Sequence, residues 1–344
     1  MKRQFYVHNS PFELESGGRL DRMELCYHIS KKRRKNEKVI WICHALTANS
    51  DPVEWWGDLA GKGKLFDPDK YTVVCVNALG SCYGSTGPTS ISPEGKEYLL
   101  SFPRVTVRDV VRSQNILREY LGIEKIDLVI GGSVGGFQAL EWSLLFPESI
   151  ENCALIACNA RVSPWGTAFN EAQRMALMSD QTFREQKSAE GGKTALAAAR
   201  AIGLISYRSY SGYAITQSEK DEEALFANRA CTYQQYQGKK LCNRFDAYSY
   251  YSMLWLTDSH NTGRGRGGVE KALGAVRAKT LIIGIEGDML FPFPEQVEIH
   301  KHIKNSRLEK ITSQFGHDGF LLEWKQISNI LSDNFEFLKQ SDFF

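Results

Sequence analysis

The sequence predicts an α/β protein with a mostly parallel central sheet flanked by helices. Strand-like apolar runs alternate with helical patterns, as expected for parallel strands joined by crossover helices. A strand, a glycine-rich turn and an apolar helix follow one another near residue 130. The alternation stops after residue 158, and residues 163–268 contain helical patterns alone. These observations favour one sheet-based core interrupted by a helical insertion.

The expected strands are short apolar or β-branched runs. In chain order they are residues 23–29, 38–43, 72–77, 127–130, 152–158, 280–285 and 308–312. Region 5–29 has no helical pattern before the next strand, so it predicts an antiparallel edge of the sheet. The basic run Lys31–Lys35 predicts an exposed hairpin tip between the first two strands. Nucleic-acid binding is the less favoured interpretation of this run, because such runs are usually solvated.

The helical stretch divides the chain into two parts. We expect an α/β core formed by residues 1–162 and 269–344, and a helical lid insertion formed by residues 163–268. A lid at this point would cover the carboxyl ends of the strands, where such sheets bind ligands, and would exclude water. The G-R-G-R-G-G string at Gly263–Gly268 is similar to an RNA-binding arginine–glycine segment. It is a single short copy between structured stretches, so a hinge or domain junction is the favoured interpretation.

A serine at the tip of a tight turn is the strongest chemical signal in the chain. Residues 131–135 fit G-x-S-x-G and lie between the strand 127–130 and a helical pattern that ends before Pro147. This is the context of a nucleophile elbow, because glycines let strand and helix approach and the helix N-terminus faces the serine. Ser133 is therefore the expected nucleophile. A buried serine in a purely structural turn is the alternative.

A serine nucleophile requires a general base and a carboxylate that orients the base. Asp288 follows the strand 280–285 in a Gly/Pro-rich loop and is the expected acid, with Glu286 as the alternative. His317 lies in the loop after the strand 308–312 and is the expected base. His44 also follows a strand and is the main competitor, but we expect it to support its own loop.

Further groups are expected around this serine. An oxyanion hole needs two backbone N–H groups. One is expected from Val134, and the other from Leu46 or, alternatively, Thr47, in the loop after the strand 38–43. Arg200 and Tyr207 lie seven residues apart, on one face of a helix in the insertion. A guanidinium on such a face is suited to binding a carboxylate.

Composition argues against several classes of function. The net charge of +2 and a sequence pI of about 8.0 do not favour nucleic acid or a membrane surface as a partner. No segment has the form of a signal peptide or approaches the ~18 apolar residues of a membrane span. The eight cysteines include no C-x-x-C pair. We therefore expect reduced thiols, no metal site and a cytoplasmic protein.

Several strings of specific sequence extend over residues 38–325. They are His44–Thr47, Trp55–Trp56, Asn77–Pro88, Gly131–Trp142, Ala199–Tyr207, Asn243–Ala247, Gly263–Gly268 and Gly316–Asp318. Together they resemble the homoserine O-acetyltransferases of the α/β-hydrolase superfamily, and the CYGSTGP and NRFDA strings are the most specific. The chain departs from the family pattern at Val134, where Met is usual, and at Ala78.

The resemblance implies an α/β-hydrolase fold and a ping-pong transfer of an acyl group from acetyl-CoA to the hydroxyl of L-homoserine. The product, O-acetyl-L-homoserine, serves methionine biosynthesis, and acetyl-CoA is a co-substrate rather than a permanently bound cofactor. The implied residues are the triad Ser133, Asp288 and His317 and the substrate-binding residues Arg200, Tyr207 and Asp318. A homodimer formed through the lid is also implied.

Other functions on the same scaffold remain open. They are a homoserine O-succinyltransferase, a serine O-acyltransferase and a serine esterase or other hydrolase. A non-enzymatic ligand-binding protein is a further alternative, against which the complete set of triad residues argues. An esterase and a transferase form the same acyl-enzyme and differ only in the acceptor, so the dependence of acyl-CoA consumption on an added amino acid distinguishes them.

Overall fold

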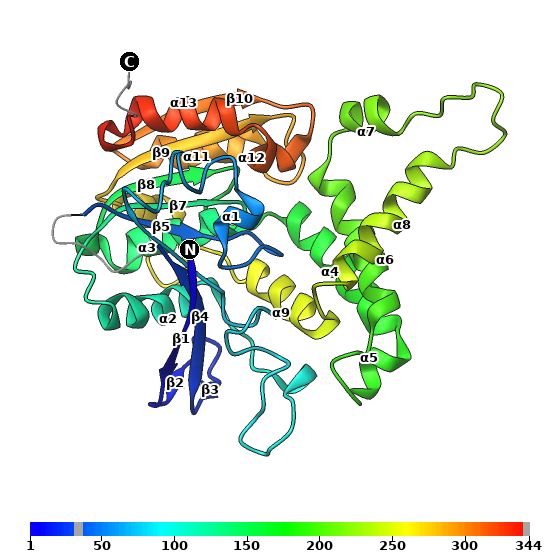
Figure 1. Ribbon diagram of the computed structural model, residues 1–344, viewed down its shortest axis with the longest axis horizontal. Coiled ribbons are helices and arrows are strands. Elements are labelled where there is room, and N and C mark those ends of the chain that lie inside the picture. The colour runs from blue at the N-terminus through cyan, green and yellow to red at the C-terminus, as the bar shows by residue number, and fades with distance from the viewer. Residues whose placement is uncertain (31–36, 340–344) are drawn as a thin grey trace.

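The computed structural model describes residues 1–30 and 37–339 (Figure 1). The expected hairpin tip at Lys31–Lys35 lies outside these residues. An eight-stranded sheet with the order β1-β4-β6-β5-β7-β8-β9-β10 forms the centre of the core. Its strands are β1 (Lys2–His8), β4 (Met23–Ile29), β5 (Val39–Cys43), β6 (Thr72–Val76), β7 (Ile126–Gly132), β8 (Ile150–Ile156), β9 (Lys279–Glu286) and β10 (Ser306–Thr312). β2 (Phe12–Glu13) and β3 (Arg19–Leu20) form a separate pair.

Strand direction divides the sheet into two zones. The strands from β6 across to β10 pair in parallel, whereas β1 pairs antiparallel with β4, and β4 antiparallel with β6. The antiparallel edge expected near the N-terminus is therefore confirmed. Both faces of the parallel zone are buried from β6 to β9, as in other parallel sheets, whereas the edge strand β10 is partly exposed. In β5, Val39 and Trp41 pack into one apolar cluster, while Ile40 and Ile42 pack into another on the opposite face.

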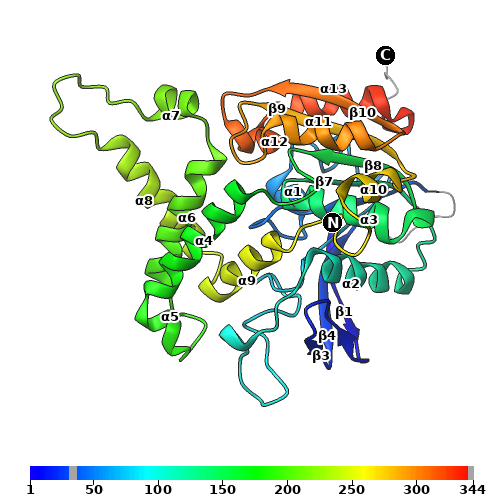
Figure 2. The ribbon, with the colours of Figure 1, turned by 180° about the vertical axis from the view of Figure 1, so that it is seen from behind.

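Helices cover both faces of the sheet, which confirms the predicted fold class (Figures 1 and 2). The core helices are α1 (Pro52–Trp55), α2 (Val107–Tyr120), α3 (Val134–Leu145), α10 (Val269–Gly274), α11 (Phe293–His302), α12 (Gly319–Leu322) and α13 (Trp324–Asn334). Val110 of α2 and Leu140 of α3 join the cluster on one face, and Ile327 and Leu331 of α13 join the cluster on the other.

Between β8 and β9 the chain forms a group of helices beside the core. These are α4 (Pro164–Ser179), α5 (Gln181–Glu185), α6 (Lys193–Tyr207), α7 (Tyr210–Gln217), α8 (Arg229–Cys242) and α9 (Ala247–Asp258). α7 and α8 extend away from the sheet in both views (Figures 1 and 2). We call α4–α9 and their connections the insertion. The finer division into a core of 1–162 and 269–344 and a lid of 163–268 remains a prediction.

The insertion leaves and rejoins the core at one place. Arg161 and Asn261 form a β-bridge, and the Thr262 N–H donates to the Ala160 carbonyl at 3.0 Å.

Among residues 1–30 and 37–339, no helix combines the length and the apolar character that a membrane-spanning segment requires.

The expected junction at Gly263–Gly268 is tied to the core by ion pairs. Arg266 binds both oxygens of the buried Glu141 of α3, at 3.0 and 2.7 Å. Arg264 binds Glu15 at 2.8 Å, and Arg108 of α2 approaches both carboxylates, at 3.0 and 3.4 Å. Because Glu141 is buried, removal of its arginine partners would leave an unpaired buried charge, which is strongly destabilising. Arg264 and Arg266, the two arginines of the G-R-G-R-G-G string, therefore bind carboxylates of the core. These ion pairs explain the string without a nucleic-acid partner.

Candidate active site

Ser133 lies in the turn between β7 and α3 and has a φ of 57° and a ψ of −126°. A positive φ strains a non-glycine residue, and such strain is found at functional sites. The flanking glycines let strand and helix meet closely, because a Cβ on Gly131 would lie 2.2 Å from the Gly135 carbonyl group. The turn therefore holds Ser133 at the carboxyl end of β7, in the geometry that the sequence predicted.

Three side chains from separate loops meet at this turn. His317 Nε2 lies 2.8 Å from Ser133 Oγ, and His317 Nδ1 lies 2.7 Å from Asp288 Oδ2. The other carboxylate oxygen, Asp288 Oδ1, accepts the N–H groups of Leu290 at 2.8 Å and Phe291 at 2.9 Å. These bonds fix the carboxylate, so Nδ1 donates to Asp288 and Nε2 faces the serine hydroxyl as an acceptor.

Of the two acids considered for this position, Asp288 is the one in contact with the imidazole. Glu286 is exposed and pairs with Lys310 of β10 at 3.1 Å. It stands at the end of β9, whereas Asp288 lies two residues further, in the loop that turns back toward Ser133. The structure thus separates two acids that the sequence places side by side.

The imidazole is poised to accept a proton. Burial alone would lower the pKa of His317, but the charge of Asp288, the hydrogen bond to it and the charge of Asp318 hold that pKa above its ordinary value. A raised pKa makes the neutral imidazole a stronger base toward the Ser133 hydroxyl.

The loop 44–47 lies against the N-terminus of α3. His44 Nε2 accepts the Ala78 N–H at 2.9 Å, and its Nδ1 donates to the Ala45 carbonyl at 2.8 Å. Gln138 of α3 donates to the His44 carbonyl at 3.1 Å. Burial lowers the pKa of His44 to about 4, so it remains neutral and structural. Both ring nitrogens of His44 are therefore used within its own loop and by Ala78, and neither contacts Ser133.

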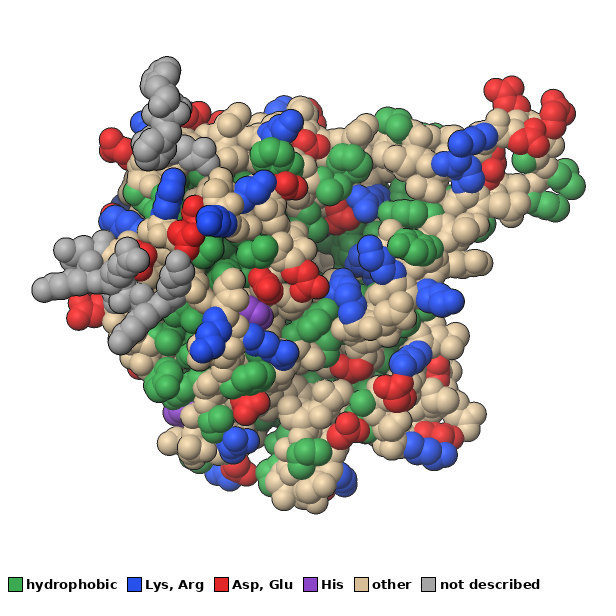
Figure 3. Space-filling view, in the orientation of Figure 1, with side chains coloured by type: hydrophobic (Ala, Val, Ile, Leu, Met, Phe, Trp, Pro, Cys, Tyr) green, Lys and Arg blue, Asp and Glu red, His purple; other side chains and the backbone are tan. Residues whose placement is uncertain are grey.

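A pocket of about 500 Å³ lies above the serine, between core and insertion. Figure 3 shows it as a hollow bordered by Lys and Arg side chains. The lining includes Leu46, Val134 and Thr47, whose backbone N–H groups were considered for an oxyanion hole. The lining also includes Arg200 and Tyr207 of α6, and Asp318. All the residues expected to form the site are therefore at one cavity or buried directly behind it.

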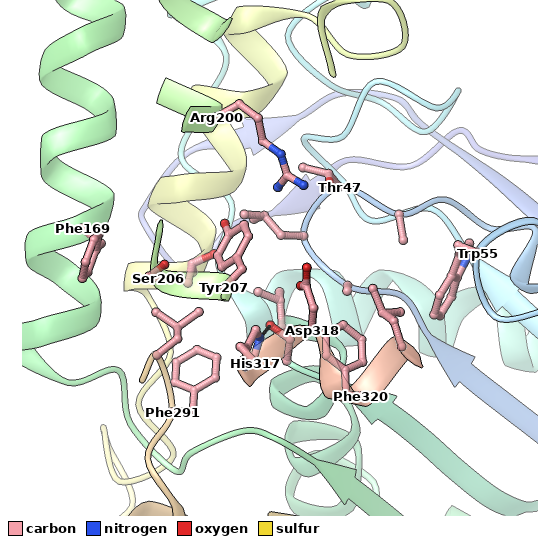
Figure 4. Close-up of a pocket in the computed structure, with 18 of the residues that line it drawn as sticks. Thr47, Trp55, Phe169, Arg200, Ser206, Tyr207, Phe291, His317, Asp318 and Phe320 are labelled. Atoms are coloured by element: carbon pink, nitrogen blue, oxygen red, sulfur yellow. Dashed lines mark hydrogen bonds between the residues drawn. The ribbon is translucent and has the colours of Figure 1, made fainter. Parts of the chain in front are cut away.

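The substrate-binding candidates are arranged around the triad histidine. Arg200 and Asp318 extend toward one another from opposite sides of the pocket (Figure 4). The Arg200 guanidinium lies over the Tyr207 ring, 5.2 Å from its centroid, and that ring lies 6.1 Å from the His317 ring. One pocket wall thus presents a cation and the opposite wall a carboxylate, in the pocket that Ser133 also lines.

Sequence reasoning missed Arg208, which pairs with Asp318 at 3.3 Å. Burial raises the pKa of Asp318, while the charges of Arg208, Arg200 and His317 oppose that rise. Arg208 directly follows Tyr207, so the two-turn spacing that selected Arg200 and Tyr207 did not select it. A search for cations next to the selected aromatic residue would have found it.

Comparison with known proteins places this site in a class. Residues 38–323 match the α/β hydrolase fold family. Over 333 residues, the chain is 44% identical to homoserine O-acetyltransferase from Cyclobacterium marinum, covering 96% of this chain and 94% of the relative. The chain therefore belongs to the homoserine O-acetyltransferase family.

Solved structures agree on the fold. Homoserine O-acetyltransferase from Bacillus anthracis superposes with a TM-score of 0.87 at 23% identity, covering 98% of each chain. An acetylester hydrolase from Corynebacterium glutamicum superposes with a TM-score of 0.85 at 23% identity, covering 97% of this chain and 96% of the other. The fold alone does not distinguish transfer from hydrolysis, since both similarities are nearly equal.

Proposed function

We propose that this protein is a homoserine O-acetyltransferase, which transfers an acetyl group from acetyl-CoA to the hydroxyl of L-homoserine and so supplies O-acetyl-L-homoserine for methionine biosynthesis. One observation carries the proposal beyond family membership. A nucleophile–histidine–carboxylate chain shares its pocket with a cation, Arg200, and a carboxylate, Asp318. A free amino acid carries a carboxylate, which can pair with Arg200, and an ammonium group, which can pair with Asp318. The biosynthetic role favours a cytoplasmic location.

The first half-reaction forms an acyl-enzyme. His317 Nε2 takes the proton of Ser133 as Oγ attacks the thioester carbonyl. The N–H groups of Leu46 and Val134 stabilise the oxyanion that develops. When the carbon–sulfur bond breaks, the imidazolium returns the proton to the coenzyme A sulfur. Free coenzyme A and acetyl-Ser133 result, while Asp288 stabilises the imidazolium throughout.

The second half-reaction transfers the acetyl group to the amino acid. Arg200 binds the carboxylate of homoserine and Asp318 its ammonium group, which fixes the distance from these groups to the hydroxyl. His317 removes the hydroxyl proton as the oxygen attacks the ester carbonyl of acetyl-Ser133. The carbon–Oγ bond then breaks, and the proton returns to Ser133.

Transferase and hydrolase differ in what the acyl-enzyme accepts. We propose that the insertion acts as a lid that limits water in the pocket, since water competes for the acyl group. The test is the consumption of acetyl-CoA with and without homoserine. Consumption that depends on homoserine supports transfer, and equal consumption without an amino acid supports an esterase. Parallel assays with succinyl-CoA and with serine separate the remaining alternatives.

We also propose that the insertion forms a homodimer. It exposes large apolar side chains, and the most exposed are Tyr210 of α7 at 87% and, in the connection between α7 and α8, Leu225 at 86% and Phe226 at 73%. Monomeric proteins rarely expose large apolar patches, and such patches commonly mark sites of association with another protein. Sedimentation at micromolar concentration should give a dimer, and Phe226→Asp should shift it toward monomer. A monomeric wild-type protein would contradict the proposal.

A further inference from the structure

We propose that Arg244 is a positioning residue for the oxyanion hole. It lies in the turn between α8 and α9 of the insertion, yet its guanidinium reaches the core loop 44–47. Arg244 Nη1 donates to the Thr47 carbonyl and to the Tyr83 hydroxyl, both at 2.5 Å, and Nη2 donates to Thr47 Oγ1 at 3.4 Å. The inference rests on the proposed function, in which the neighbouring Leu46 N–H stabilises the oxyanion.

The two halves of the loop have different supports. His44 and Gln138, both from the core, hold the residues at its start. Thr47, at its end, is held by Arg244 and by the Tyr83 hydroxyl, which lies 3.5 Å from the Thr47 carbonyl. Among the described residues, Arg244 is the one insertion residue that hydrogen-bonds to residues 44–48. Leu46 therefore lies between a support from the core and a support from the insertion.

The turn that carries Arg244 is itself fixed. Phe245 is buried and packs edge to face on the Tyr83 ring, with centroids 5.5 Å apart. The Arg244 carbonyl accepts a bond from Cys82 Sγ at 3.6 Å, and Asp246 caps α9 through the Ser249 N–H at 2.7 Å. The backbone that carries the Arg244 guanidinium is therefore fixed beside the loop, and the side chain itself is exposed.

The hydrogen-bond partners of Arg244 are unusual for a positively charged side chain. Within the described part of the chain, Arg244 has no carboxylate within ion-pair distance, and its donors go to one carbonyl and two hydroxyls. Charge-assisted bonds are stronger than neutral ones, so the charge strengthens the hold on Thr47. Both half-reactions pass through an oxyanion, and misplacing a catalytic group by about 1 Å can cost on the order of 10²-fold in rate. Loss of Arg244 should therefore slow both steps.

The experiment compares two acyl donors, acetyl-CoA and p-nitrophenyl acetate, which lacks the coenzyme. For Arg244→Ala we expect kcat/KM to fall by about 10- to 100-fold with both donors, with the KM for homoserine near its wild-type value. Arg244→Lys should recover part of the rate, and millimolar guanidinium chloride should partly rescue Arg244→Ala. The matched control is Lys239→Ala, which removes an exposed cation from the last turn of α8 and should match wild type.

Two results would overturn the inference. If Arg244→Ala raised the KM for acetyl-CoA and left p-nitrophenyl acetate turnover unchanged, Arg244 would bind the coenzyme instead. If both donors reacted with Arg244→Ala at the wild-type rate, the loop 44–47 would not need Arg244 for its position. Circular dichroism and Tm check folding. If Arg244→Ala is unfolded, Arg244→Lys with and without Thr47→Ala gives the same comparison. A wild-type enzyme that never acylates Ser133 would defeat the proposed function itself.

Discussion

Core and insertion present their functional groups to the pocket in opposite ways. The core supplies Ser133, Asp288 and His317, which are buried at 7%, 5% and 2% exposure and are linked by bonds of 2.7 and 2.8 Å. The insertion supplies Arg200 on α6, which packs beside α4 and α8, two helices that expose large apolar side chains such as Met175 and Tyr236. From this difference we expect the core to hold the bond-making groups, and Arg200 of the insertion to select the acceptor together with Asp318 of the core.

The largest effect should come from the core nucleophile. Ser133→Ala should lower transfer on the order of 10⁶-fold, as loss of the nucleophile does in comparable triads. Wild-type protein incubated with acetyl-CoA and no acceptor should gain one acetyl mass on the peptide that contains Ser133, and the variant should gain none. Mass spectrometry of the digest provides the measurement. Sequential kinetics with an unlabelled wild-type protein would exclude the covalent route.

A smaller but still large effect is expected at the acid. Asp288→Asn should cost on the order of 10⁴-fold in kcat, because the amide no longer orients the imidazole or stabilises its charged form. Glu286→Gln is the matched control, since Glu286 lies two residues away and pairs with Lys310 instead. Steady-state rates of both variants decide the assignment. A greater loss in the Glu286 variant would reverse it.

Arg200 of the insertion should show its effect on the acceptor alone. Arg200→Ala should lower kcat/KM for homoserine by about 10- to 100-fold, the range expected for one charged hydrogen-bonded contact, while acetylation of Ser133 stays near normal. Single-turnover acylation and steady-state transfer, measured in parallel, separate the two. Arg184→Ala, an exposed arginine of α5, should change neither. Blocked acylation in Arg200→Ala would assign that guanidinium to the coenzyme.

The smallest expected effect is on pH dependence. His317 acts as a base only when neutral, and its pKa lies above 6.5, so kcat/KM should fall as pH drops through a value above 6.5. Asp288→Asn removes the charge that raises this pKa, so the acid limb of its residual activity should move to lower pH. Profiles of both proteins from pH 5 to 9 test this. An unchanged limb would mean that another group controls it.

Local pattern was enough to predict the groups carried by the core. A strand, glycine-rich turn and helix predicted the elbow at Ser133, and strand ends with Gly or Pro nearby predicted the loops of Asp288 and His317. The contacts of Arg208 with Asp318 and of Arg244 with Thr47 join positions 110 and 197 residues apart. No local pattern encodes such pairs, because they depend on where the insertion docks. The catalytic roles and the lid boundaries remain predictions.

The shared attachment point of the insertion has an evolutionary consequence. Because Arg161 and Asn261 are bridged, the segment between them begins and ends at neighbouring positions. Its length can therefore change without altering the register of β8 against β9, and closing a longer loop costs little extra entropy. The Bacillus anthracis transferase and the Corynebacterium glutamicum acetylester hydrolase share this fold at nearly equal similarity. The insertion is thus a part of the molecule that can change in length while the sheet beneath it stays constant.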